Sequence, residues 1–210
     1  MKHRVSGWFA RVHEDVLTTV FRLLARARHD RAFHPRGVQV TGELTGAADP
    51  FPAKATVTAR LSKGAGTGPG LPDVLGLALR IPTARGDWDL LLSTTGTTAV
   101  TRFLPKFVRR WRDARLGTLA PYRYRGELVW FMAVPGEGEP PTRFTLHASG
   151  KDAGWRRVAE VTLHPEEPAA EPVAFDPVLT LPDGMELAPR WLASVRAKAY
   201  RGSRRGRQAS

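Results

Sequence analysis

The chain begins with apolar residues spaced as on one face of a helix. Between residues 5 and 28 they recur at steps of four, in a row formed by Trp8, Val12, Val16, Val20 and Leu24. This spacing predicts an amphipathic helix of about six turns. We expect this helix to pack on its own domain, with basic residues near its C-terminal end, where cations are favourable. Arg22, Arg26 and Arg28 line those turns and leave a membrane-surface or partner helix as the alternative.

From residue 37 the pattern changes to a period of two. Alternating runs predict strands with one buried face, and the more continuously apolar runs at 74–81 and 88–93 predict strands buried on both faces. Gly- and Pro-rich stretches separate the runs. The predicted strands are residues 37–45, 54–62, 74–81, 88–93, 122–134, 143–148 and 157–164.

The remaining segments predict helices and a linker. Residues 106–116 are expected to form a short basic helix, 165–172 a Pro/Glu-rich linker, and about 189–200 a last helix before an Arg-rich tail. The whole pattern predicts an α+β protein: an antiparallel β-barrel with an N-terminal amphipathic helix and a C-terminal helix. We expect one domain overall, in which 1–30 is the helix packed on the barrel, 31–175 the barrel core, and 176–210 the last helix and basic tail.

Composition narrows the class of protein. The chain has 210 residues, of which 42% are hydrophobic and 25% charged, as expected for a globular domain. No run of about 18 apolar residues occurs, so we expect no transmembrane segment. No signal-peptide pattern precedes the first helix, and we expect a cytoplasmic protein. The absence of cysteine excludes disulfides, thiolate catalysis, Cys zinc sites, iron–sulfur clusters and thiolate-ligated haem.

The net charge of +12 has three interpretations. It rests on 26 Arg and 6 Lys against 20 acidic residues. The excess could bind a polyanion, such as nucleic acid or an anionic membrane. A few Arg could instead hold carboxylates or phosphates of a ligand. Most of the Arg could also be solvated and reflect composition alone. Two clusters support the first interpretation: Arg109, Arg110, Arg112 and Arg115, and the tail residues Arg201, Arg204, Arg205 and Arg207.

Arg196 and Tyr200 are the first candidates for ligand chemistry. They are four residues apart in the predicted last helix, so their side chains share one face. A guanidinium beside a phenol favours the phenolate, which is a hard anionic ligand suited to ferric iron. By itself, such a pair is more typical of a helix surface.

Further motifs occur in a fixed order along the chain. Arg31 and His34 stand just before the first predicted strand, and Arg60 and Ser62 lie in the second. A segment Asp-x-x-Gly-x-Ala then leads into Gly-x-Trp-Asp-Leu, formed by Asp73, Gly76, Ala78, Gly86, Trp88, Asp89 and Leu90. The last helix adds the Arg-x-x-x-Tyr pair, preceded by Gly184 and followed by Arg207. This series resembles the haem-binding core of the haem catalase superfamily, over about residues 28–105 and 176–207.

The resemblance implies a role for each matching residue. Tyr200 would be the proximal ligand of the iron of haem b, and Arg196 would hydrogen-bond to it, which makes the last helix the haem-ligating helix. His34 would be the distal acid–base group, and Ser62 would orient it. Phe103, or Leu104 beside it, stands where the family packs an aromatic ring over the distal haem face. The residues that would hold the haem propionates are Arg31, Arg60 and Arg207.

One departure from the family pattern changes the expected activity. Catalases carry a distal Asn at the position of Thr94, and no Asn occurs in this chain. A preorganised donor of this kind contributes a few kcal/mol of transition-state stabilisation by analogy with oxyanion holes. We therefore expect an oxidoreductase that acts on hydrogen peroxide or an organic hydroperoxide as a peroxidase or hydroperoxide-converting enzyme, with weak catalase activity at most and Thr94 in the distal position.

Two alternatives remain open at this point. The first is a haem-binding carrier or sensor without catalysis, and the second is a basic polyanion-binding module without haem. Stacking aromatics are missing among the tail Arg, so we expect no specific nucleic-acid partner. The sequence is also compatible with a homodimer.

Overall fold

The alternating runs form antiparallel strands in a computed structural model, which describes residues 39–188 apart from 65, 69, 99, 100, 152, 153 and 172. Two 3-10 helices, η1 (Thr101–Phe103) and η2 (Trp111–Asp113), are the described helical segments. The strands are β1 (Gln39–Gly46), β2 (Lys54–Lys63), β3 (Leu75–Thr83), β4 (Gly86–Thr94), β5 (Leu116–Gly117), β6 (Tyr122–Tyr124), β7 (Glu127–Pro135), β8 (Arg143–Ser149), β9 (Arg156–Pro168) and β10 (Met185–Leu187).

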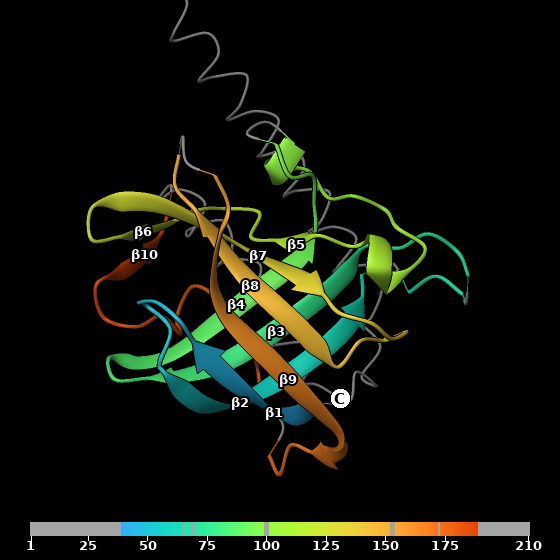
Figure 1. Cartoon of the computed structure of the whole chain (residues 1–210), viewed down its shortest axis with the longest axis horizontal. Coiled ribbons are helices and arrows are strands. Elements are labelled where there is room, and N and C mark those ends of the chain that lie inside the picture. The colour runs from blue at the N-terminus through green and yellow to red at the C-terminus, as the bar shows by residue number, and fades with distance from the viewer. Residues whose placement is uncertain are drawn as a thin grey trace, which may run out of the picture. The chain divides into compact units, whose positions relative to one another are not determined.

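Eight of these strands close into a barrel (Figure 1). The ring runs β1–β2–β3–β4–β5–β7–β8–β9 and returns to β1, and every pair in it is antiparallel. The strands β6 and β10 lie outside the ring, where β6 pairs with the first part of β7 and β10 pairs with β6. Closure removes the free edges that a flat sheet would expose.

The period of two sets which side chains fill the barrel. In β3, Leu77, Leu79 and Ile81 are almost fully buried, whereas the residues between them are half-buried. The neighbouring strands bury the residues opposite these positions. Leu79 pairs with Ala59 of β2 and Leu90 of β4, and both are inaccessible to solvent. Successive side chains of a strand point to opposite faces, so one parity fills the core and the other forms the outer face.

Aromatic rings pack together within this core. Trp88 of β4 and Phe131 of β7 meet with their ring centroids 5.0 Å apart. Phe51 lies 5.1 Å from Trp88, and Tyr122 of β6 lies 5.7 Å from it. Tilted and edge-on pairs of this kind add about 0.5–1.5 kcal/mol each beyond the burial of their area.

The barrel confirms the antiparallel architecture, but the α+β class is wrong for the described residues. They form an all-β protein in which η1 and η2, with three residues each, are the helical segments and no α-helix occurs. The two helices expected at 5–28 and 189–200 lie outside the described residues. Among the described residues, no helix is long and apolar enough to span a membrane.

The basic helix expected over 106–116 is also wrong. The backbone N–H groups there bond to distant segments: Lys106 donates to the carbonyl of Thr94 at 2.8 Å, and Val108 to that of Asp73 at 2.9 Å. The backbone N–H of Trp111 donates to the carboxylate of Glu139 at 3.0 Å. These partners replace the bonds of an α-helix, and only η2 remains helical.

Several strand boundaries differ from the predicted ones. The run 122–134 is divided into β6 and β7 by a two-residue turn, in which Arg125 and Gly126 both have positive φ, of 50° and 85°. Two positive φ values define the turn that best matches the twist of a hairpin. The linker expected at 165–172 belongs in part to β9, which continues to Pro168. The short strands β5 and β10 were not predicted.

Candidate functional site

The structure describes four of the nine predicted site residues. They are Arg60 and Ser62 in β2, Thr94 at the end of β4, and Phe103 in η1. The other five lie outside the described residues, and their roles stay predictions: Arg31, His34, Arg196, Tyr200 and Arg207.

Arg60 and Ser62 share the outer face of the barrel. They have the opposite parity to Val57 and Ala59, whose side chains are buried. Arg60 pairs with Ala78 of β3, and Ser62 pairs with Gly76. On its other side β3 pairs with β4, where Ala78 is opposite Leu91 and Gly76 is opposite Ser93. The outer surface around Arg60 and Ser62 is therefore made of very small side chains on β3.

Gly76 leaves room for the side chain of Ser62 in its present rotamer. A Cβ atom at position 76 would lie 2.6 Å from the Oγ atom of Ser62, which is closer than Cβ contacts occur in proteins. The absence of a side chain therefore leaves room for the Ser62 hydroxyl in front of β3. Together with Ala78, it leaves little side-chain bulk on the outer face of β3 beside Arg60 and Ser62.

Arg60 carries a buried donor without an acceptor. Its Nε atom is inaccessible to solvent and has no hydrogen-bond partner among the described residues, a property that it shares with Nε1 of Trp88, Nε1 of Trp130 and Nδ1 of His147. A buried donor left unpaired costs about 1–3 kcal/mol, so such groups are rare and usually meet a ligand or water. A carboxylate is the acceptor that a guanidinium binds most strongly. The Arg60 guanidinium, with the small side chains of Gly76 and Ala78 beside it, is compatible with a ligand that bears a carboxylate.

A polypeptide segment covers the outer face next to this surface. The preceding row of the sheet pairs Thr58, Arg80 and Asp89. Arg80 forms two hydrogen bonds of 2.7 Å to the carboxylate of Asp89, which is fully buried. The backbone N–H of Asp176 donates to the same carboxylate at 2.6 Å. Hydrogen bonding to Asp89 raises the pKa of Arg80. We therefore assign Arg80, Asp89 and Asp176 a structural role.

Thr94 and Phe103 do not share the face of Arg60 and Ser62. The Thr94 side chain has the parity of Leu90 and Leu92 and is fully buried, and its hydroxyl donates to the carbonyl of Lys106 at 2.5 Å. A hydroxyl has one hydrogen, so Thr94 is left with acceptor capacity only. Phe103 packs edge-on against Trp130 at 6.1 Å.

Ser93 of β4 is a polar residue near Ser62 that the sequence analysis did not name as a site residue. It lies on the outer face opposite Gly76, one position before Thr94. The signal was present in the sequence, since Leu90 and Leu92 alternate with Leu91 and Ser93 along the strand. Counting parity from the apolar positions would have assigned Ser93 to the face of Ser62.

A second polar cluster lies around Tyr124 in β6. Its hydroxyl donates to the carboxylate of Asp49, which also pairs with Arg125 at 2.8 Å. Burial, and then the hydrogen bond to Asp49, raise the pKa of Tyr124 above its ordinary value. The contacts join the loop after β1 to the β6–β7 turn and indicate a structural role.

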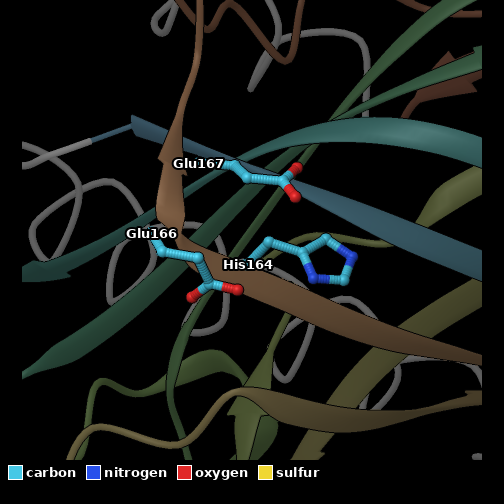
Figure 2. Close-up of side chains that lie close together, drawn as sticks. All are labelled: His164, Glu166 and Glu167. Carbon is cyan, nitrogen blue, oxygen red and sulfur yellow. The ribbon is translucent and has the colours of Figure 1, made fainter.

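Three potential metal ligands meet near the end of β9 (Figure 2). The ligand atoms of His164, Glu166 and Glu167 lie within 4.8 Å of one another. A shift of register brings them together, because Thr41 pairs with His164 while the preceding residue of β1 already pairs with Pro168. Both carboxylates are exposed, and that of Glu167 accepts a hydrogen bond from Thr41 at 2.9 Å. This arrangement is that of a solvated strand end, and we assign it no ligand.

Comparison with solved structures identifies the class of fold. The chain is similar to catalase A from Saccharomyces cerevisiae, with a TM-score of 0.60 and 13% sequence identity. The alignment covers 83% of this chain and 60% of the catalase chain. The barrel is therefore catalase-like. No family model matches the sequence, and no curated protein matches it.

Proposed function

We propose that this protein binds haem b and acts on a peroxide, as a peroxidase or a hydroperoxide-converting enzyme. The observation that carries the proposal is the unpaired, buried Nε of Arg60 on the outer face of β2, next to the small residues Gly76 and Ala78 of β3. A haem propionate would supply the acceptor that this donor lacks, and the small side chains would leave room for the macrocycle. The catalase-like barrel supports the same proposal, because Arg60 and Ser62 lie in its second strand, where the sequence resembles the catalase motif.

The remaining contacts of the cofactor fall to residues outside the described part of the chain. Arg31 and Arg207 would hold the propionates together with Arg60, since two carboxylates that enter a protein need paired cations. Tyr200 would ligate the iron as a phenolate, and the guanidinium of Arg196 would keep its pKa low enough for that state. Haem, when bound, supplies a redox-active iron that can take up the oxidising equivalents of a peroxide.

The acid–base chemistry would fall to His34 and Ser62. His34 would take the proton from one peroxide oxygen and return it to the other as the O–O bond breaks, for which an imidazole has a suitable pKa. Ser62 would hydrogen-bond to the imidazole and hold its orientation. Its hydroxyl has room to do so because Gly76 carries no side chain.

The second candidate function is a haem carrier or sensor without catalysis. The observation that favours it is the hydrogen bond from Thr94 to the carbonyl of Lys106. That bond uses the only hydrogen of the hydroxyl at the position where catalases have an Asn, so Thr94 offers no donor to a bound peroxide.

Spectroscopy with a haem titration tests the proposal. We expect the purified chain to bind haem with a Soret band and the features of a ferric phenolate, and bound haem to raise the melting temperature because it binds only the folded state. Tyr200→Phe should abolish the phenolate features. Arg60→Gln should weaken haem binding by about tenfold, the value of one hydrogen bond to a charged group. Arg143→Gln, a change of an exposed Arg in β8, is the matched control and should have no effect.

The outcomes separate the two candidate functions. Haem binding without turnover of cumene hydroperoxide would leave the carrier, whereas turnover that survives His34→Ala would remove the acid–base role of His34. If no haem-dependent absorption or thermal shift develops, or if Arg143→Gln acts like Arg60→Gln, the haem proposal itself is lost.

A further inference from the structure

Two neighbouring loops expose large apolar side chains to solvent. Leu71, in the β2–β3 loop, is 57% exposed, and Phe107, in the segment between β4 and β5, is 60% exposed. Leu104 of the same segment is 39% exposed. Only one other large apolar side chain among the described residues is comparably exposed, Leu179. Isolated exposed apolar residues are ordinary, but a group of them marks an interaction surface.

The two loops are joined by backbone hydrogen bonds (Figure 1). The N–H of Asp73 donates to the carbonyl of Val108 at 2.8 Å, and the N–H of Val108 donates back at 2.9 Å. The Asp73 carboxylate, which is buried, also orders its own loop by accepting from the backbone N–H and the hydroxyl of Thr67, both at 2.9 Å. Leu71 and Phe107 therefore lie in segments that meet at the same end of the barrel.

Basic residues flank Phe107 along the chain, and two of them, Arg110 and Arg112, lie beside the turn between β7 and β8. Lys106, Arg109, Arg110 and Arg112 are all exposed, and none of them forms an ion pair with a described residue. Their turn is anchored, because the Trp111 side chain is buried against Phe144 and the Glu139 carboxylate accepts the N–H groups of Trp111 and Arg112. With Arg115 included, the segment carries five cations, and four carboxylates lie on it or next to it, those of Asp73, Asp113, Glu137 and Glu139.

We propose that this end of the barrel docks on an anionic lipid bilayer. The docking surface consists of Leu71, Leu104 and Phe107 with the four cations Lys106, Arg109, Arg110 and Arg112. Phe107 and the two Leu enter the boundary between headgroups and acyl chains, while the cations meet anionic headgroups. A nucleic acid would use the cations but would leave Leu71 and Leu104 in water, and its binding to single strands relies on several stacking aromatics rather than one.

Vesicle co-sedimentation of the full chain tests this proposal. We expect binding to vesicles that contain phosphatidylglycerol, little binding to phosphatidylcholine alone, and loss of binding at high salt. Phe107→Ser should lower the partition coefficient by about tenfold, from the lost apolar burial. Each of Arg109→Gln, Arg110→Gln and Arg112→Gln should lower it by about fivefold. Haem-free and haem-loaded protein should partition equally, so the result is independent of the proposed function.

Leu179→Ser is the matched control. Leu179 is 69% exposed but follows Asp176, which binds Asp89 at the other end of β4 from Thr94. Its replacement should leave the partition coefficient unchanged, and melting curves should show that every variant is folded, since all the replaced side chains are exposed. Equal binding to neutral and anionic vesicles, no binding, or an oligonucleotide that binds through the Arg residues without dependence on Phe107 would each overturn the proposal.

Discussion

At the scale of single residues, the parity of a position on its strand decides what it can do. Arg60 and Ser62 face outward beside Gly76, on the face to which we assign the proposed ligand. Thr94 has the opposite parity, and its hydroxyl is already bonded to Lys106. Asp89 lies on the same outer face as Arg60, but its carboxylate is used by Arg80 and by the backbone of Asp176.

Removal of the Asp89 carboxylate should strongly destabilise the fold. Asp89→Ala leaves the partly buried Arg80 without its partner and the N–H of Asp176 without its acceptor. Loss of one member of a buried pair costs about 3–5 kcal/mol, and we expect the lower end because Arg80 is 25% exposed. Urea unfolding measures the change.

Lys54→Ala provides the comparison for that experiment. It removes the ion pair with Glu43, in which both side chains are more than half exposed. Such a surface pair contributes about 0–1 kcal/mol. If the two variants were equally stable, the structural role of Asp89 would be wrong.

Tyr124 should make stability depend on pH on the alkaline side. Burial and the bond to Asp49 raise the pKa of its phenol in the folded state. The neutral phenol is therefore favoured by folding, and its contribution is fully present below the unfolded pKa of about 10 and is lost as the pH rises through the folded pKa. At neutral pH, Tyr124→Phe should cost about 1 kcal/mol.

The difference between wild type and Tyr124→Phe should shrink as the pH rises above about 10. Unfolding midpoints of both proteins over this range measure it. The phenolate absorbance gives a second readout, in which the variant should lack the phenol whose pKa burial and Asp49 raise. A Tyr124 that titrates at or below the ordinary pKa would contradict the prediction.

At the scale of elements, close backbone contacts determine which strands become neighbours. β1 lies between β2 and β9, although β9 is far away in the sequence. Gly42 of β1 permits this contact, because a Cβ atom there would lie 2.7 Å from the carbonyl oxygen of Thr162 in β9. Contacts with distant segments also explain why residues 106–116 are not a helix, since their backbone donors bond to Thr94, Asp73 and Glu139.

Gly42→Ala should weaken the pairing of β1 with β9. The added methyl group meets a backbone oxygen that cannot rotate away, and overpacking of this kind costs about 1–3 kcal/mol. Thermal or urea unfolding measures the loss. Gly154→Ala is the control, because no atom lies within 4 Å of the added Cβ and the backbone there is not left-handed. We expect it to be neutral or to stabilise by up to about 1 kcal/mol; equal losses in the two variants would show that the Thr162 contact is unimportant.

At the scale of the whole molecule, the closed ring creates the inner and outer faces on which the proposals depend. The pairing of β7 with β8 and of β9 with β1 completes the barrel and joins segments that the sequence separates widely. One end of the ring carries the proposed docking surface, and the outer face of β2 and β3 carries the candidate haem surface. The two proposals therefore rest on different residues, and each can fail without the other.

The sequence by itself determined the positions of most strands and the face that each residue occupies, because the period of two is a local property of an extended chain. It therefore placed Arg60 and Ser62 on a common face, and parity could have placed Ser93 with them. Only the tertiary structure decided that Gly76 lies opposite Ser62, that Arg60 retains an unpaired buried donor, and that 106–116 is held by Thr94, Asp73 and Glu139 rather than by helical bonds. These features depend on hydrogen bonds and contacts between residues far apart in the chain, and no local pattern encodes them.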